Sequence, residues 1–211
     1  MFNWDNHYKY GGKSSDSDYH AAREWKQSIL LKYYRQNIDT IIDVGCGDLQ
    51  LWEGLTPASG KYTGIDISPT IIDAHKKMYP DRNFICANSG TPLNISADIV
   101  TCFDVLWHIV DENTYVNTLK NIQYYAKKYA LIYTWYRNPL RFPFGLYAMA
   151  VQSKKNRKLF FDRTFTTDGS YQKYREFLEY ANPIFNPNFE LIAQYTDKQF
   201  KYGMMYVFRH K

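Results

Sequence analysis

The segment that most constrains the fold is Thr40–Gly47, Thr-Ile-Ile-Asp-Val-Gly-Cys-Gly, together with Asp66, nineteen residues after Gly47. Its apolar residues are typical of a buried strand in a parallel sheet, and the glycines then allow a tight turn where backbone approaches a ligand closely. Asp66 ends the next apolar run, so we expect its carboxylate beside that turn, placed to accept hydrogen bonds from ribose hydroxyls. Two neighbouring strand ends therefore predict one site for a nucleotide-like cofactor.

The residues after the turn argue against a dinucleotide. A dinucleotide-binding turn has a third glycine three residues after the second, which lets a pyrophosphate sit on the helix N-terminus. That position is Gln50 here, and Asp48 adds a negative charge that suits a diphosphate poorly. A cofactor that has a ribose but no phosphate, such as S-adenosylmethionine, fits this sequence better.

With these residues the chain resembles the class I S-adenosylmethionine-dependent methyltransferases over most of residues 38–135. The resemblance implies S-adenosylmethionine as cofactor and S-adenosylhomocysteine as product. It also implies that Asn88 meets the adenine amino group, where Asp is commoner in the family, and that the segment 103–109 lines the methionine end. The cofactor-binding residues that it implies are Asp43, Gly45, Cys46, Gly47, Asp66, Ile67, Asn88, Ser89, Phe103 and Asp104.

The periodicity of the remaining sequence predicts an α/β fold. Strands that alternate with helices imply βαβ units, and with the resemblance we expect a Rossmann-like, mostly parallel seven-stranded sheet with helices on both faces. Helices are predicted to begin near residues 17–18, at Ser68-Pro69 and at Asp111. Further strands are predicted at 98–102 and 130–135, and a C-terminal antiparallel hairpin at 189–195 and 202–208. His75 is interpreted as a packing residue of the second helix.

Two segments lie outside this minimal fold. Residues 1–20 carry no helix or strand pattern but are rich in aromatic residues, which need somewhere to bury surface. We expect them to form an ordered flap over the active site, hinged at Gly11-Gly12, although a disordered tail is the alternative. Residues 21–211 are predicted to form a single domain with an insertion at about 136–170 that holds a basic cluster at 154–158.

Composition excludes some classes of function. With 26 basic and 21 acidic residues, the net charge of +5 is a mild excess, so a nucleic-acid partner is not expected. No apolar run reaches the ~18 residues of a spanning helix, and no secretory signal is visible, so we expect a cytoplasmic protein without membrane insertion. The three cysteines lack metal-ligand spacing and are interpreted as free thiols, with no metal site expected. The oligomeric state is not indicated.

Methyl transfer from a sulfonium is an in-line displacement, and a hydroxyl acceptor needs a base. His108 is the candidate catalytic base, because imidazole titrates near neutral pH, but a packing histidine is equally compatible with the sequence. Tyr8, Tyr10, Trp107 and Trp135 are the candidate substrate-binding residues, and either tryptophan could instead belong to the core.

The function predicted is methylation of an oxygen or nitrogen of a small polar metabolite, of which a sugar is one type. The alternatives are an RNA or protein methyltransferase that docks through the insertion, and a non-catalytic module that binds the cofactor.

Overall fold

A computed structural model describes residues 3–14, 19–55, 57–137, 164–167, 170–196 and 203–211. The basic cluster at 154–158, most of the predicted insertion and residues 15–18 lie outside the described residues. Across the part of the chain that is described, no helix combines the length and the apolar character needed to cross a membrane.

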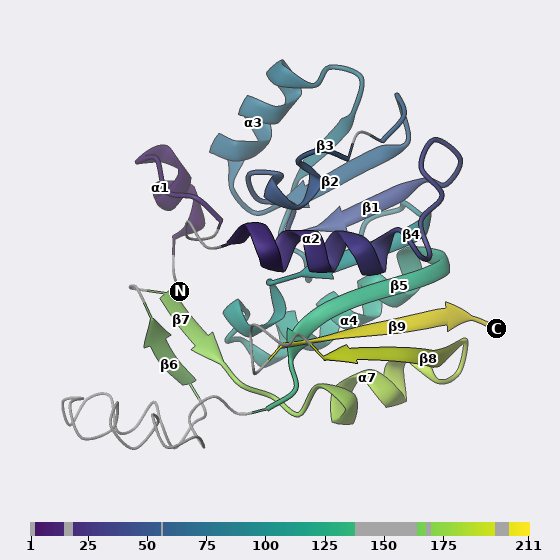
Figure 1. The fold of residues 1–211 in the computed structure, drawn as a ribbon. Coiled ribbons are helices and arrows are strands. Elements are labelled where there is room, and N and C mark those ends of the chain that lie inside the picture. The colour runs from purple at the N-terminus through teal and green to yellow at the C-terminus, as the bar shows by residue number, and fades with distance from the viewer. Residues whose placement is uncertain (1–2, 15–18, 56, 138–163, 168–169, 197–202) are drawn as a thin grey trace, which may run out of the picture.

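One seven-stranded sheet forms the centre of the molecule, with strand order β3-β2-β1-β4-β5-β9-β8 (Figure 1). The first five strands in that order run parallel, whereas β9 is antiparallel to both β5 and β8. Their bounds are β1 (Ile41–Val44), β2 (Tyr62–Asp66), β3 (Asn83–Cys86), β4 (Ala97–Phe103), β5 (Ala126–Trp135), β8 (Phe189–Thr196) and β9 (Gly203–His210). The predicted fold class and the C-terminal hairpin are confirmed.

Helices cover both faces of this sheet. Adjacent residues of β1 point to opposite faces, so Ile41 packs with one core and Ile42 with the other. The first core includes residues of α2 (Tyr19–Leu30) and α3 (Pro69–Met78). The second includes residues of α4 (Glu112–Tyr125) and α7 (Phe177–Phe185). Because both faces are covered, the exposed ends of the parallel strands are where a ligand can reach the sheet.

The predicted helix starts agree with the structure where residues are described. The Ser68 side chain accepts a hydrogen bond from the N–H of Ile71, and Pro69 is the first residue of α3. Asp111 caps α4 in the same way through the N–H of Thr114. Two short 3-10 helices, η1 (Gln50–Trp52) and η2 (Leu106–His108), follow the ends of β1 and β4.

The structure differs from the sequence prediction in two places. Residues Trp4–Lys9 form a helix, α1, in a segment predicted to have none; Asn3 caps it, and the helix packs against α3. Strand β5 begins at Ala126, directly after α4, four residues earlier than predicted. A further two-stranded sheet, β6 (Thr164–Thr167) and β7 (Ser170–Lys173), lies at the end of the predicted insertion, and β7 lies beside η2.

Candidate active site

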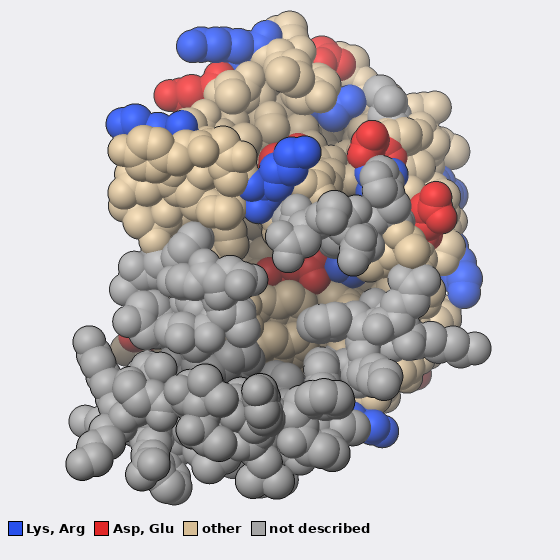
Figure 2. All heavy atoms as spheres, turned by 60° about the vertical axis from the view of Figure 1, so that its left-hand side comes forward, with Lys and Arg blue, Asp and Glu red and all other residues tan. Residues whose placement is uncertain are grey.

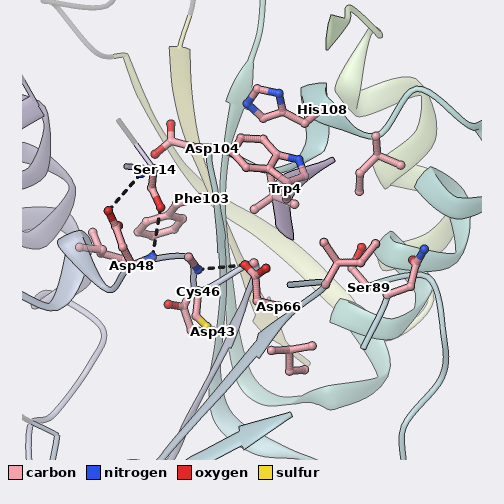
Figure 3. Close-up of a pocket in the computed structure, with 18 of the residues that line it drawn as sticks. Trp4, Ser14, Asp43, Cys46, Asp48, Asp66, Ser89, Phe103, Asp104 and His108 are labelled. Atoms are coloured by element: carbon pink, nitrogen blue, oxygen red, sulfur yellow. Dashed lines mark hydrogen bonds between the residues drawn. The ribbon is translucent and has the colours of Figure 1, made fainter. Parts of the chain in front are cut away.

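A pocket opens at the edge of the sheet where the parallel strands end. Figure 2 shows this side of the molecule, with Asp and Glu atoms visible in red within a recess. The residues that line the pocket come from the ends of β1, β2 and β4, from the segment after β3, and from the N-terminal segment (Figure 3). They are Trp4, Tyr8, Ser14, Asp43, Gly45, Cys46, Gly47, Asp48, Gln50, Leu51, Ile65, Asp66, Ile67, Ala87, Asn88, Ser89, Phe103, Asp104, Val105, His108, Ile109 and Thr114.

The turn after β1 is a backbone cradle that only glycine can form without strain. Gly45 and Gly47 have φ angles of +75° and +50°, a region that costs other residues about 1–2 kcal/mol. A Cβ atom on Gly45 would collide with the Val105 side chain, and one on Gly47 would collide with the Ser14 hydroxyl. The glycines therefore let the Val105 and Ser14 side chains approach the turn closely.

Asp43 is held entirely by the protein. Its carboxylate accepts hydrogen bonds from Trp52 Nε1 at 2.7 Å, from the Tyr62 hydroxyl at 3.1 Å and from Thr101 Oγ1 at 2.8 Å. Burial raises the pKa of this carboxyl, and the three donors partly offset that rise. Asp43 thus joins β1, β2, β4 and η1 beneath the glycine turn, where a charge without such donors would be costly.

Asp66 connects the ends of β1 and β2. One carboxylate oxygen accepts from the N–H of Gly47 at 3.0 Å, and the other accepts from the N–H of Ser68, also at 3.0 Å. Burial raises the pKa of Asp66, against these backbone donors. A carboxylate has about four acceptor positions, and three backbone N–H groups act on Asp66, so the carboxylate retains capacity for a further donor.

His75 stabilises the glycine turn through a hydrogen bond. Its Nε2 lies 2.7 Å from the carbonyl oxygen of Gly47, and its ring packs against Phe84 with 5.1 Å between centroids. Burial lowers the pKa of His75, so the ring is neutral at pH 7 and Nε2–H donates to that carbonyl. His75 therefore packs in the core, as interpreted from the sequence, and it also stabilises the glycine turn that shapes the pocket.

The N-terminal segment contacts the same turn. Ser14 and Asp48 exchange two hydrogen bonds, from Ser14 N to the Asp48 carboxylate at 3.0 Å and from Asp48 N to Ser14 Oγ at 3.1 Å (Figure 3). The Tyr8 hydroxyl lies 2.9 Å from Ser14 Oγ. At the other end of α1, Asp5 accepts hydrogen bonds from Ser68 Oγ and from the N–H of Thr70 at 2.8 and 2.9 Å. These contacts tie residues 5–14 to both strand ends that form the site.

The opposite side of the pocket carries His108 and a partly buried ion pair. The rings of Trp4 and His108 meet edge to face, with 4.9 Å between centroids. Lys26 of α2 is only 2% exposed; its ammonium lies 2.5 Å from the Asp104 carboxylate and 4.1 Å from the centre of the Tyr133 ring. Asp104 has a φ of +63°, unusual for a residue with a side chain. This part of the pocket therefore combines an imidazole, an indole and a carboxylate that Lys26 holds in place.

The pocket brings together most of the predicted site residues. Among its lining are His108, Tyr8 and every predicted cofactor-binding residue. Tyr10 is not brought there: it follows the last residue of α1 and is 81% exposed. Trp107 and Trp135 are also outside the lining; they are buried and stack on each other, with ring centroids 4.9 Å apart. The sequence left open whether these tryptophans line the pocket or belong to the core, and in the structure both belong to the core.

Sequence reasoning missed several residues that shape this site. Ser14 and Lys26 carry no sequence signal, because their roles depend on partners 34 and 78 residues away. Asp48 was interpreted only as unfavourable to phosphate, yet it also binds the N-terminal segment. The sequence did contain one signal for α1, since Asn3 is a favoured N-cap residue ahead of Trp4.

Comparisons with known proteins agree with this geometry. Residues 42–127 match the family model described as a methyltransferase domain. A curated relative, a ubiquinone biosynthesis O-methyltransferase of Coxiella burnetii, is 31% identical over 93 residues. The match covers 39% of this chain and 40% of the relative, so the chain matches less than half of that relative's length.

Solved structures extend the similarity of fold to nearly the whole chain. The magnesium protoporphyrin IX methyltransferase of Synechocystis PCC 6803, solved with S-adenosylhomocysteine, gives a TM-score of 0.63 at 17% identity, with 97% of this chain and 92% of that chain covered. An S-adenosylmethionine-dependent methyltransferase of Methanosarcina mazei gives 0.66 at 16% identity, with 86% and 96% covered. By sequence over residues 42–127, and by strand order and fold over nearly the whole chain, the protein is similar to class I S-adenosylmethionine-dependent methyltransferases.

Proposed function

We propose that this chain binds S-adenosylmethionine in the pocket and transfers its methyl group to an oxygen or nitrogen of a small polar molecule. The observation that carries the proposal is the meeting of three features in one pocket. These are the glycine turn, the Asp66 carboxylate with free acceptor capacity, and His108 on the opposite side.

The residues present fit this cofactor. Gly45 and Gly47 of the turn line the pocket without side chains, and Asp66 can accept hydrogen bonds from a ribose. Asn88 lies after β3, and its Oδ1 accepts from the N–H of Gly90 at 2.9 Å, which leaves a second acceptor position on Oδ1 for an adenine amino group. Among the described residues that line the pocket, four are aspartates and none is Lys or Arg, so a positively charged sulfonium suits the lining better than a phosphate does.

When bound, S-adenosylmethionine supplies a methyl group on a positively charged sulfur. The chain must orient an acceptor in line with that methyl group, keep water away and remove a proton from a hydroxyl acceptor. We assign proton removal to His108, whose ring is fixed by its edge-to-face contact with Trp4. Trp4 and Tyr8 of the N-terminal segment lie at the same pocket, and we propose residues 3–14 as the flap that covers it.

A small acceptor is favoured by the shape of the site and by one relative. Trp4, Tyr8 and Ser14 of the N-terminal segment line the pocket, and the segment is fastened through Asp5 and Ser14, which favours a small acceptor over a large polymer. The Coxiella burnetii relative bears the name of an O-methyltransferase of ubiquinone biosynthesis, which supports oxygen as the acceptor atom.

A transfer assay with a labelled methyl group tests the proposal. The purified chain is incubated with methyl-labelled S-adenosylmethionine and separate extract fractions of small metabolites, RNA and protein, with Asp66→Ala as the control. We expect label only in the small-molecule fraction and only with the unmodified chain. Label in RNA or protein would replace the proposed acceptor class, and cofactor binding without labelling of any fraction would indicate a binding module.

A further inference from the structure

One buried arginine outside the pocket contacts the wall that carries His108. Arg175 lies between β7 and α7 and is 5% exposed, although arginine is rarely buried this fully. Its Nη1 donates to the carbonyl of Ile109 at 2.7 Å, and its Nη2 donates to the carbonyl of Val110 at 3.0 Å. Its Nε donates to the Glu112 carboxylate at 3.0 Å. The guanidinium thus binds three groups on one short loop.

That loop is part of the pocket wall. It begins directly after His108, the last residue of η2, and ends at the first turn of α4. Ile109 and Thr114, on either side of the Arg175 contacts, both line the pocket. The guanidinium also stacks over the ring of Tyr115, 4.1 Å from its centre, so the contacts of Arg175 extend into α4. The three hydrogen bonds and the ring contact of Arg175 described above therefore fall within residues 109–115.

The geometry of these contacts requires an arginine. A planar guanidinium donates in several fixed directions at once, whereas a lysine ammonium is a compact charge that cannot span two carbonyls and a carboxylate. Without the guanidinium, the carbonyls of Ile109 and Val110 would lose a charged donor at a partly buried position. The loop would then be free to shift, and His108, which is joined to it, would shift with it.

We propose that Arg175 is a positioning residue, which fixes the loop 109–112 so that His108 keeps its place and ring orientation in the pocket. Arg175 directly follows the segment that contains β6 and β7, and β7 lies beside η2. The C-terminal end of the insertion is thereby connected to the position of His108. The consequence for catalysis depends on the function proposed above, but the effect on the His108 ring does not.

The test measures the His108 ring in the whole chain, without cofactor or acceptor. The ring lies 4.9 Å from Trp4 and 5.9 Å from Trp107, so its Cε1–H resonance should experience ring currents from both indoles. The resonance is assigned by its loss in His108→Gln, and is then recorded in Arg175→Met and Arg175→Lys. The matched control is Arg209→Met. Arg209 is an exposed arginine of the C-terminal hairpin, and its ion pair is with Glu190.

We expect the His108 resonance to move toward its random-coil position in Arg175→Met, and to move in the same direction in Arg175→Lys. Arg209→Met should leave it in place. If Arg175→Met fails to fold, Arg175→Lys decides. An unchanged His108 resonance in the folded variants, or an equal shift in Arg209→Met, would overturn the proposal whether or not the chain methylates anything.

Discussion

Replacing His75 with phenylalanine should weaken the cofactor site without removing a single residue that faces the pocket. The substitution keeps an aromatic ring against Phe84 but deletes the donor that lies 2.7 Å from the carbonyl of Gly47. Gly47 is buried, so its carbonyl would be left without this partner beneath the turn. The glycine turn would then lose one of the contacts that define its shape.

The expected magnitude follows from the hydrogen bond. A neutral hydrogen bond contributes about 0.5–1.5 kcal/mol to stability, and a buried acceptor left unpaired costs about 1–3 kcal/mol. We therefore expect the free energy of unfolding to fall by about 1–3 kcal/mol. If most of that loss relaxes the turn, cofactor affinity should fall about ten-fold, because 1.4 kcal/mol corresponds to one factor of ten.

The pH dependence of this effect gives a second check. Burial lowers the pKa of His75 below its ordinary value of 6.5, so the folded chain binds a proton there less readily than the unfolded chain does. The stability that neutral His75 contributes is complete above pH 6.5, and it is lost as the pH falls from there through the lowered pKa. The stability difference between the two proteins should therefore shrink in acid, because phenylalanine does not titrate.

The assay combines chemical denaturation at pH 8 and pH 5.5 with calorimetric titration of S-adenosylmethionine. His75→Gln is the matched variant, since its amide can still donate toward the Gly47 carbonyl, and it should retain more affinity than His75→Phe. Equal stability and equal affinity in wild type and His75→Phe would refute the role given to this hydrogen bond.

Three further predictions concern the pocket itself. Because burial raises the pKa of Asp66, its carboxylate takes up a proton at a higher pH than a free aspartate does. Cofactor affinity should therefore stay constant above that raised pKa and decline as the pH falls through it. Calorimetry that finds constant affinity down to pH 3.8 would contradict this prediction. His108→Gln should lower turnover by about 10²- to 10⁴-fold with unchanged cofactor affinity, whereas near-normal turnover would make His108 a packing residue. Deletion of residues 1–16 should lower turnover strongly and the melting temperature only slightly. Full turnover in the shortened chain would identify the segment as a tail.

The sequence predicted which residues lie together in the part of the pocket proposed for the cofactor, because these residues are local. The glycine turn and Asp66 lie at the ends of adjacent strands, and parallel strands bring their carboxyl ends to one edge. The same is true of Asn88 and Asp104, which follow β3 and β4. Strand order alone was enough to place these residues together.

The other half of the site depends on contacts that no local pattern contains. Lys26 occurs in a helix and Arg175 in a loop, and both residue types are usually exposed, so their burial became visible only with their partners. Trp107 and Trp135 illustrate the opposite problem, since an aromatic residue at a strand end can face either a pocket or the core. Helix α1 is only six residues long, and contacts such as that of Asp5 with α3 support it.

The most direct test of the proposed cofactor site is a calorimetric titration of S-adenosylmethionine and of NAD into the wild-type chain and into Asp66→Ala. Asp66 is predicted to hold the ribose, and Gln50 replaces the glycine that a dinucleotide requires. We expect S-adenosylmethionine to bind the wild type, NAD not to bind, and the substitution to weaken cofactor binding by about 1–3 kcal/mol, as when charge-assisted hydrogen bonds are lost. Unchanged affinity in Asp66→Ala, or preferential binding of NAD, would contradict the site described here.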